Sequence, residues 1–341
     1  MVATLRDVAR AAGVSPATAS RALSAPELVA PARRALVEKA AQDLGYRPNL
    51  AARGLTTGRT GNLCLVVPDL GNPFFAGVAK GVQRRARELG HAVFVADSDE
   101  DARLEADLVE RLSAQADGTL VCSPRMSDER LAELTADRHV VLVNRRLPGR
   151  PSVVVDNTDG MRQAVRHLHA LGHRRIGYAG GPEGSWSDAR RRDGLKVAAH
   201  GLHRLEVVDL GHFAPTVVGG TAAGDLVAAA SITAVIAHND LVALGITERL
   251  RVRGRSVPAD VSVIGYDDTV GTLGHPALTT VAIRLARLGS VAVDLLLDGR
   301  ASTGRAAATG ADEDDISLPV ELVVRGTTGP APTPPTDGVS R

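Results

Sequence analysis

The sequence predicts an α/β protein in which a short all-helical segment precedes two tandem α/β units with parallel sheets. Residues 1 to about 48 carry apolar side chains at helical spacing in three short groups. From Asn62 onward, apolar runs alternate with amphipathic stretches, which is the pattern of βαβ units. A second series of the same alternation starts near residue 152. The 341 residues are enough for two or three domains at about 100 to 200 residues each.

The helical segment carries start and stop signals that define its elements. Thr4 and Asp7 have the spacing of a capping box, and Gly13 follows as a helix-ending residue. Ser15 followed by Pro16 is typical of an N-cap and a first helical position. We therefore expect one helix, a tight turn at Gly13, a second helix and a third helix, all within residues 1 to about 48.

The elements of the two α/β units follow one another regularly. Strands are predicted at the apolar runs LCLVV, AVFVA, GTLVC and VVLVN, and then at VVV, RIGYAG, EVVDL, AVIAH and VSVIGYD. Helices are predicted between them, over residues 75–89, 101–115, 127–137, 159–171, 188–199, 218–230 and 241–253. Residues 301–315 are small and acidic, and residues 328–341 are rich in Pro, Thr and Gly. Because neither has apolar side chains to bury, we expect a loose loop and a disordered tail.

Composition and charge narrow the class of protein. Hydrophobic residues at 44% and charged residues at 23% are typical of a globular chain. Residues 1–60 carry a net charge of +5, although the whole chain carries only +1, so the basic end is a candidate nucleic-acid contact. Cys64 and Cys122 lie in apolar runs and are expected to be small buried hydrophobes. No stretch has the pattern of a signal peptide or a membrane span, so a cytoplasmic protein is expected.

Residues 4–23, TLRDVARAAGVSPATASRAL, have the organisation of a helix-turn-helix. Such a motif presents its second helix to the major groove of DNA. Arg21 can donate two hydrogen bonds to guanine, and Thr18 and Ser20 can reach phosphates. The alternative is a small helical cap with a solvated Arg21.

The N-terminal sequence resembles the headpiece of the lactose-repressor (LacI/GalR) family of bacterial transcription regulators. The resemblance continues through LGYRPNLAARGLTTGRTGNLCLVVPDLGNPFF, residues 44–75, which is similar to the end of the family's third helix, its hinge and its first core strand. It implies that Pro16, Ala17 and Arg21 read base edges, Tyr46 touches the DNA backbone, and Leu55 wedges into the minor groove. The full set of expected DNA contacts is Thr4, Ser15, Pro16, Ala17, Thr18, Ser20, Arg21, Tyr46, Asn49, Arg53 and Leu55.

Two positions depart from the family pattern. Ala30 stands where many relatives have a serine N-cap, which is expected to cost the third helix about 1 kcal/mol. Gly54 weakens a hinge helix by about 1 kcal/mol relative to alanine. The resemblance thus implies four parts: a headpiece over 1–48, a hinge helix and linker over 49–61, a core over 62–327, and a tail over 328–341.

The tandem α/β region resembles the family's ligand-binding core, which is itself similar to periplasmic sugar-binding proteins. Ligands of open α/β sheets bind at the carboxyl ends of strands, and most of the eight aromatic residues follow predicted strands. A sugar needs flat aromatic surface beside groups that bind its hydroxyls. The resemblance implies effector contacts for Phe74, Phe75, Asp156, Arg191, Phe213, Asn239 and Asp267, and Trp186 is a further candidate. Asp267 and Asp240 could instead cap helices, and Phe75 could belong to the core.

Three classes of function compete at this point. A homodimeric regulator, whose affinity for a pseudo-palindromic operator depends on a small effector, accounts for the whole chain. A sugar-binding protein accounts only for the second part, and a sugar-modifying enzyme would need a nucleophile or cofactor motif that the sequence lacks. The ten histidines show no metal-ligand spacing, so no metal and no cofactor are expected. Within the regulator class, the effector could be a sugar, a purine or nucleoside, or a partner protein.

Overall fold

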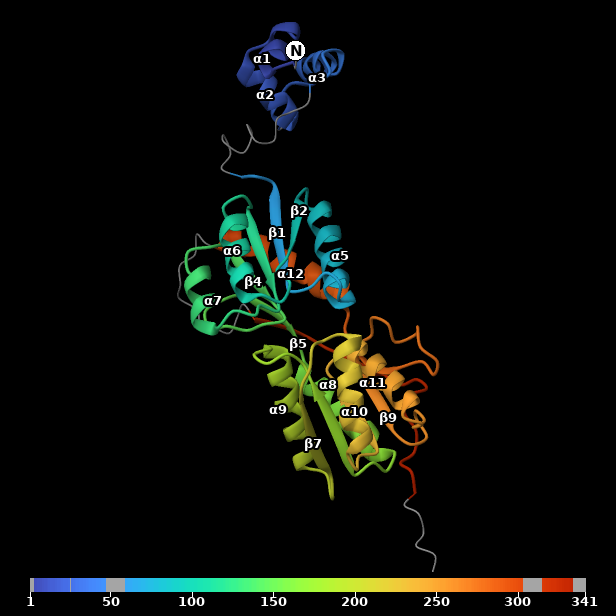
Figure 1. Ribbon diagram of the computed structural model, residues 1–341. Helices are drawn as coiled ribbons and strands as arrows, with labels where there is room; N and C mark the ends of the chain where they lie inside the picture. Colours follow the sequence, from blue (N-terminus) through green and yellow to red (C-terminus); the bar gives the residue numbers. More distant parts are fainter. Residues whose placement is uncertain (1–2, 25, 47–58, 303–314, 334–341) are drawn as a thin grey trace, which may run out of the picture. The chain divides into compact units, whose positions relative to one another are not determined.

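The computed structural model describes residues 3–24, 26–46, 59–302 and 315–333. The chain forms two compact units, Met1–Gly61 and Asn62–Arg341 (Figure 1). The first unit is helical within its described residues. Its elements are α1 (Leu5–Ala11), α2 (Pro16–Ser24), a short 3-10 helix (Pro26–Leu28) and α3 (Pro31–Asp43).

The helix caps of the first unit agree with the sequence. The Thr4 hydroxyl and the Asp7 carboxylate form the predicted capping box of α1. Ser15 Oγ accepts a hydrogen bond from the Thr18 backbone N–H at 3.1 Å, as expected of the N-cap of α2. Ala30, by contrast, makes no side-chain hydrogen bond at the start of α3. The buried side chains of this unit are small: Val8, Ala9, Ala19, Ala22, Val37, Ala40 and Ala41. Because such a core buries little apolar area, the caps contribute a large share of its stability.

The second unit consists of two lobes, each built on one sheet. The first lobe contains β1 (Asn62–Val67), α5 (Pro73–Glu88), β2 (Ala92–Asp97), α6 (Ala102–Ser113), β3 (Gly118–Cys122), α7 (Asp128–Thr135), β4 (Val140–Val143), β5 (Ser152–Val155), α12 (Leu285–Ser302) and β11 (Asp315–Leu318). The second lobe contains α8 (Asn157–Ala170), β6 (Arg175–Gly180), α9 (Trp186–His200), β7 (Glu206–His212), α10 (Val217–Ala229), β8 (Ala234–Ala237), α11 (Asp240–Val252), β9 (Ser262–Asp267), β10 (Thr279–Ala282) and β12 (Glu321–Val323).

The two sheets have equivalent strand orders. The first is β2-β1-β3-β4-β5-β11, with every neighbouring pair parallel. The second is β7-β6-β8-β9-β10-β12, in which only the β10–β12 pair is antiparallel. This order places a topological switch point beside β1 in one lobe and beside β6 in the other, where parallel sheets bind ligands.

The lobes are joined by the chain and by their cores. The chain passes between them after β5, after β10 and after β11. One cluster of buried apolar side chains also contains residues of both, including Val155 from the first lobe and Tyr266 from the second. The lobes therefore meet through packed side chains as well as through three connecting segments.

The structure confirms the predicted strands and helices as far as Asp267 and corrects the rest. Sequence analysis missed β10, α12, β11 and β12. The predicted loop 301–315 overlaps the end of α12 and the first residue of β11, and residues 303–314 lie outside the described part of the chain.

The prediction that a disordered tail begins at residue 328 is wrong for residues 328–333, which are described. The Thr328 hydroxyl is 2.9 Å from His167 Nε2, and the Ala331 N–H donates to the Leu171 carbonyl at 2.8 Å. Backbone and hydroxyl hydrogen bonds hold this segment on the second lobe without any large apolar side chain.

The missing cap of α3 leads to a stability prediction. Ala30→Ser should stabilise the first unit by about 1 kcal/mol, because a serine hydroxyl can accept from an otherwise unpaired N–H of the first turn. Hydrogen exchange on the full chain should show slower exchange across α1 to α3. Ala30→Val, which adds no acceptor at this exposed position, is the control, and equal exchange in Ala30→Ser and wild type would contradict the prediction.

Candidate functional site

The outward face of α2 presents the side chains that were predicted to reach DNA. Ser15, Pro16, Ala17, Ser20 and Arg21 are exposed, and Thr18 is half-buried. Ala19 and Ala22 point into the core of the unit. The Arg21 guanidinium forms no hydrogen bond or ion pair with any residue that the structure describes, so it is available to donate to another molecule.

The other predicted DNA contacts have different positions. Thr4 is exposed, but its hydroxyl donates to Asp7 at 2.6 Å within the capping box. Tyr46 is half-buried and packs against the small core of the first unit. Asn49, Arg53 and Leu55 lie outside the described residues, as does Gly54 of the predicted hinge.

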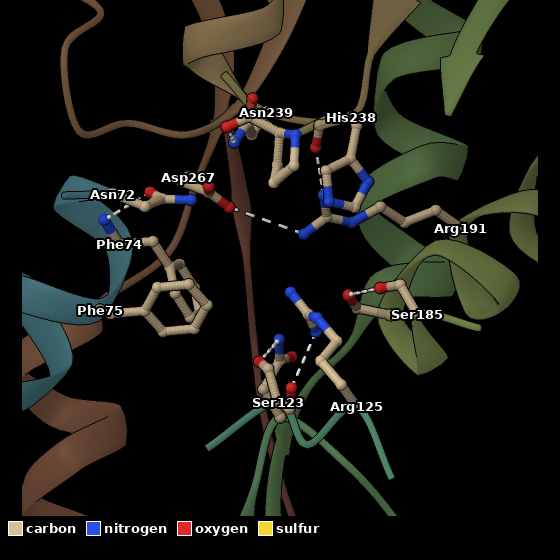
Figure 2. Close-up of a pocket in the computed structure, with 13 residues that line it drawn as sticks. Asn72, Phe74, Phe75, Ser123, Arg125, Ser185, Arg191, His238, Asn239 and Asp267 are labelled. Carbon is tan, nitrogen blue, oxygen red and sulfur yellow. Dashed lines mark hydrogen bonds and ion pairs between the residues drawn. The ribbon is translucent and has the colours of Figure 1, made fainter. Parts of the chain in front are cut away.

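A pocket lies at the carboxyl ends of both sheets, and residues of both lobes line it (Figure 2). The first lobe contributes Asn72, Phe74, Phe75, Ser123, Arg125 and Asn144, which follow β1, β3 and β4. The second lobe contributes Ser185, Ser187, Arg191, Pro215, His238, Asn239 and Asp267, which lie at or after the ends of β6 to β9. The cavity has a volume of about 30 Å³. That is about the share of one molecule in liquid water.

Two phenylalanines form an apolar wall of the pocket. Phe74 and Phe75 are buried at the start of α5, and their rings pack edge to face with centroids 5.1 Å apart. Asn72 caps this helix, because its side-chain oxygen accepts from the Phe74 N–H at 3.0 Å. The cap thus fixes where both rings enter the pocket.

Arg191 is a buried cation on the opposite wall, with 3% of its surface exposed. Its Nε donates to Asn157 Oδ1 at 2.9 Å, and another nitrogen donates to the His238 carbonyl. The guanidinium carbon lies 3.6 Å from the centroid of the Tyr266 ring, which is a close cation–π contact. These fixed groups replace the water that a charged side chain requires.

Asp267 is a buried carboxyl group with an unsatisfied oxygen. It is 5% exposed, and its Oδ1 has no hydrogen-bond donor among the described residues; the nearest Arg191 nitrogen is 3.6 Å away. Burial raises the pKa of Asp267 to about 8, although the Arg191 charge opposes this shift. Its φ of 101° is in a region that side chains rarely adopt. Strain of this kind is concentrated at functional sites.

Asn144 provides a matching unsatisfied oxygen from the first lobe. Its Nδ2 donates to Ser123 Oγ at 2.9 Å, whereas its Oδ1 has no donor among the described residues. The side chain is buried and lines the pocket. Each lobe therefore contributes to the pocket one buried oxygen that lacks a donor among the described residues.

Five of the eight predicted effector residues meet in this pocket: Phe74, Phe75, Arg191, Asn239 and Asp267. Asn239 also has a structural role, because its Oδ1 accepts from the Val242 N–H and so caps α11. Asp240 is not the cap; its carboxylate accepts from the Thr269 N–H after β9.

Three predicted effector residues are not part of the pocket. Asp156 caps α8, and with Trp186 it lines a separate cavity of about 590 Å³. Trp186 and Arg190 share one face of α9, whereas Ser187 and Arg191 share the face that lines the pocket. Phe213 packs against the core of the second lobe beside α10 and α11.

Sequence reasoning missed several pocket residues, including Ser123, Arg125, Asn144 and His238. The signal was present, because Ser123 directly follows a predicted strand, and Asn144 and His238 are the last residues of the predicted strands VVLVN and AVIAH. The rule that selected Asp267 from a strand end applies equally to these positions.

Other chemistry is limited in the described residues. They contain no group of three His, Cys, Asp or Glu side chains that could hold a metal ion. Cys64 and Cys122 are free and buried, and burial raises the pKa of their thiols to about 11 and about 12. No helix within the described ranges is long and apolar enough to cross a membrane.

Comparison with known proteins relates both units to one family. Residues 4–49 match the bacterial regulatory proteins of the lacI family, and residues 165–328 match the periplasmic binding protein-like domain. The chain is 33% identical to the HTH-type transcriptional repressor CytR of Escherichia coli K12, over 97% of each chain. This chain belongs to the lacI family. It is also 35% identical to the regulator GalS of Salmonella typhimurium, over 88% of this chain and 91% of that protein.

A solved structure supports the same assignment for the lacI-family fold. The lac repressor dimer bound to operator and the anti-inducer ONPF matches with a TM-score of 0.85 and 29% identity, covering 96% of this chain and all of the other. The relatives are transcriptional regulators and not enzymes, which agrees with the expected class. The protein is thus a DNA-binding regulator with an effector-binding core.

The raised pKa of Asp267 makes the stability of this lacI-family protein depend on pH. Between the ordinary value of 3.8 and about 8, the folded protein holds a proton that the unfolded chain has released, so Asp267 lowers stability as pH rises. Asp267→Asn cannot ionise. Near pH 8 its free energy of unfolding should therefore exceed that of wild type by about 1 to 3 kcal/mol.

Urea titrations at about pH 4 and pH 8 would measure this difference, which should vanish at the lower pH. Asp193→Asn, in which the replaced carboxylate is half exposed, should show no such dependence. A gain that is equal at both pH values would contradict the burial argument.

Proposed function

We propose that this regulator binds a polyhydroxylated effector, a sugar, between its two lobes, and that binding changes its affinity for operator DNA. The proposal rests on one observation. Asn144 Oδ1 and Asp267 Oδ1 are buried, lack hydrogen-bond donors among the described residues, and belong to opposite lobes of one pocket. An unpaired buried acceptor costs about 1 to 3 kcal/mol. A ligand that donates to both oxygens would remove that cost.

The remaining lining suits a sugar ring. Its hydroxyls can donate to the two free oxygens, and its C–H face can pack on Phe74 and Phe75. Similar regulators support this class of effector. One is the transcriptional regulator CelR, solved with cellobiose, at 31% identity and a TM-score of 0.68. Another is an Enterococcus faecium regulator solved with ribose, at 25% identity and the same TM-score.

The composition of the pocket walls supports a link between effector binding and lobe arrangement. The two walls belong to different lobes. An effector that contacts both walls therefore binds some lobe arrangements better than others. A ligand shifts a conformational equilibrium only through such a difference in affinity between two states.

Asp267→Ala tests the effector site. We expect wild-type protein to be stabilised against heat by at least one member of a panel of ribose, xylulose, cellobiose and adenosine. The variant should bind that compound at least tenfold more weakly, because it loses an acceptor for a ligand hydroxyl. Its affinity for operator DNA without effector should stay within about twofold, since Asp267 lies in the second unit.

Calorimetry would measure effector binding, and fluorescence anisotropy would measure operator binding. Unchanged effector affinity in Asp267→Ala would remove this pocket as the binding site. Binding of adenosine without any sugar would replace the proposed class of effector with a nucleoside.

We further propose that the protein acts as a homodimeric repressor on a pseudo-palindromic operator. In the first unit, the exposed face of α2 and the unpaired Arg21 support base reading. In the second unit, α10 exposes Val217, Val218 and Leu226, with Val218 79% exposed. Exposed apolar side chains of this kind mark association surfaces. A two-fold dimer would present two copies of α2 to two half-sites.

Arg21→Ala tests the reading helix. The change should cost about 1 to 3 kcal/mol of discrimination between operator and scrambled DNA, because a bidentate contact to a base is lost. Binding to scrambled DNA should persist. Arg33→Ala removes an exposed arginine of α3 and is the matched control. Parallel loss of both affinities in Arg21→Ala would assign Arg21 to phosphate contact instead.

A further inference from the structure

His238 lines the inter-lobe pocket (Figure 2), and its imidazole contacts a carboxylate that is not part of the pocket lining. The residue directly follows β8 and is 8% exposed. Its Nδ1 lies 3.2 Å from Asp188 Oδ1. Asp188 lies on α9 and does not line the pocket, so this contact uses Nδ1 and leaves Nε2 as the ring nitrogen available to a ligand.

Asp188 is a buried carboxylate that only accepts hydrogen bonds. Besides the imidazole, its Oδ1 accepts from the Tyr178 hydroxyl and from the Gly181 N–H, both at 2.7 Å. Its Oδ2 accepts from Arg192 Nε, also at 2.7 Å. These donors hold the pKa of Asp188 well below its usual range, so the group is ionised. A carboxylate has about four acceptor sites, and four donors fill them here.

This arrangement determines the tautomer of His238. An ionised carboxylate cannot donate, so the hydrogen between the two side chains must belong to the imidazole Nδ1. Burial, together with the nearby charges of Arg191 and Arg125, lowers the pKa of His238, so the ring carries a single hydrogen. Its Nε2 is therefore an acceptor, and no residue that the structure describes donates to it.

The backbone at Gly181 leaves the space that the His238 ring occupies. A Cβ atom on Gly181 would lie 2.3 to 2.6 Å from three atoms of the imidazole, which is too close for any side chain. Gly181 thus provides the space for the ring and one of the donors to Asp188. Space and hydrogen bonds together hold a polar ring at the wall of the pocket, where an apolar side chain would suffice for packing.

We propose that His238 is a specificity-determining residue of the inter-lobe pocket, with Asp188 holding it as the tautomer whose Nε2 accepts a hydrogen bond from an effector hydroxyl. The inference rests on the proposed effector pocket. It adds a third acceptor to Asn144 Oδ1 and Asp267 Oδ1, so the effector must donate at three places. A ligand that presents a carbonyl or ether oxygen to His238 is rejected, because two acceptors would face each other without a hydrogen.

The tautomer can be measured without an effector. Nitrogen NMR of protein labelled in its ten histidines should show, for His238, an imidazole with a protonated Nδ1 and an unprotonated Nε2, assigned as the signal that is absent from His238→Phe. In Asp188→Asn the hydrogen should move toward Nε2, because an amide can donate to Nδ1. Asp193→Asn, on the exposed side of the same helix, should leave the spectrum unchanged. A His238 ring that is protonated at Nε2 in the wild-type protein would overturn the proposal.

The hydroxyl contact is tested with ribose, xylulose and cellobiose, using the sugar that binds wild type most tightly and its monodeoxy analogues. One analogue should bind wild type about tenfold more weakly than the parent sugar. Both should bind His238→Phe with equal affinity, because the contact is already lost. If every analogue loses as much affinity for His238→Phe as for wild type, His238 contacts no hydroxyl and the proposal fails.

The outcomes separate this proposal from the effector class. If none of these sugars binds the wild-type protein, the proposed class of effector is wrong, and the nitrogen spectrum alone decides whether Asp188 sets the tautomer. If sugars bind and Asp267→Ala abolishes binding while His238→Phe does not weaken it, the pocket assignment stands and the role of His238 is rejected.

Discussion

A permanently charged guanidinium buried at the carboxyl edge of the second sheet constrains much of the pocket. Arg191 is 3% exposed, so protein groups must replace its water. The start of α8 supplies Asn157 Oδ1, the end of β8 supplies the His238 carbonyl, and β9 supplies the face of Tyr266. With the charge solvated in this way, Asp267 is not needed as a tight ion-pair partner, and burial keeps its pKa near 8.

The need to surround the buried charge of Arg191 leaves a pocket whose side chains have fixed positions but whose hydrogen-bonding groups are not all paired. Asp188, which does not line the pocket, accepts hydrogen bonds on both of its oxygens and holds His238 in front of it. Asn144 and Asp267, which line the pocket, each keep one oxygen free. These two unpaired oxygens lie at a surface that a ligand can cover, as expected where binding compensates for unpaired groups.

The sequence predicted the part of this fold that depends on local patterns. Regular alternation identified each strand and helix as far as Asp267, and the family resemblance selected Arg191 and Asp267, which both line the pocket. It failed after Asp267, because β11 and β12 are short strands that pair with distant segments. Trp186 was grouped wrongly because helical spacing was ignored: residues 186 and 190 face one cavity, and 187 and 191 face the other.

In the proposed function, the effect of the effector on DNA affinity depends on which contacts between the two lobes are rigid and which can change. Three chain crossings and a shared apolar cluster hold the lobes together, yet polar side chains from both lobes meet at the pocket. Apolar packing resists sliding, because interiors are close-packed. Under the proposed function, a ligand that changes the separation of the pocket walls would therefore rotate the lobes about the crossings as rigid bodies. The carboxyl end of β1 approaches the pocket, while its first residue, Asn62, begins the second unit directly after the DNA-binding segment. The same strand thus links the effector wall to the start of the core, so lobe rotation reaches the point where the first unit is attached.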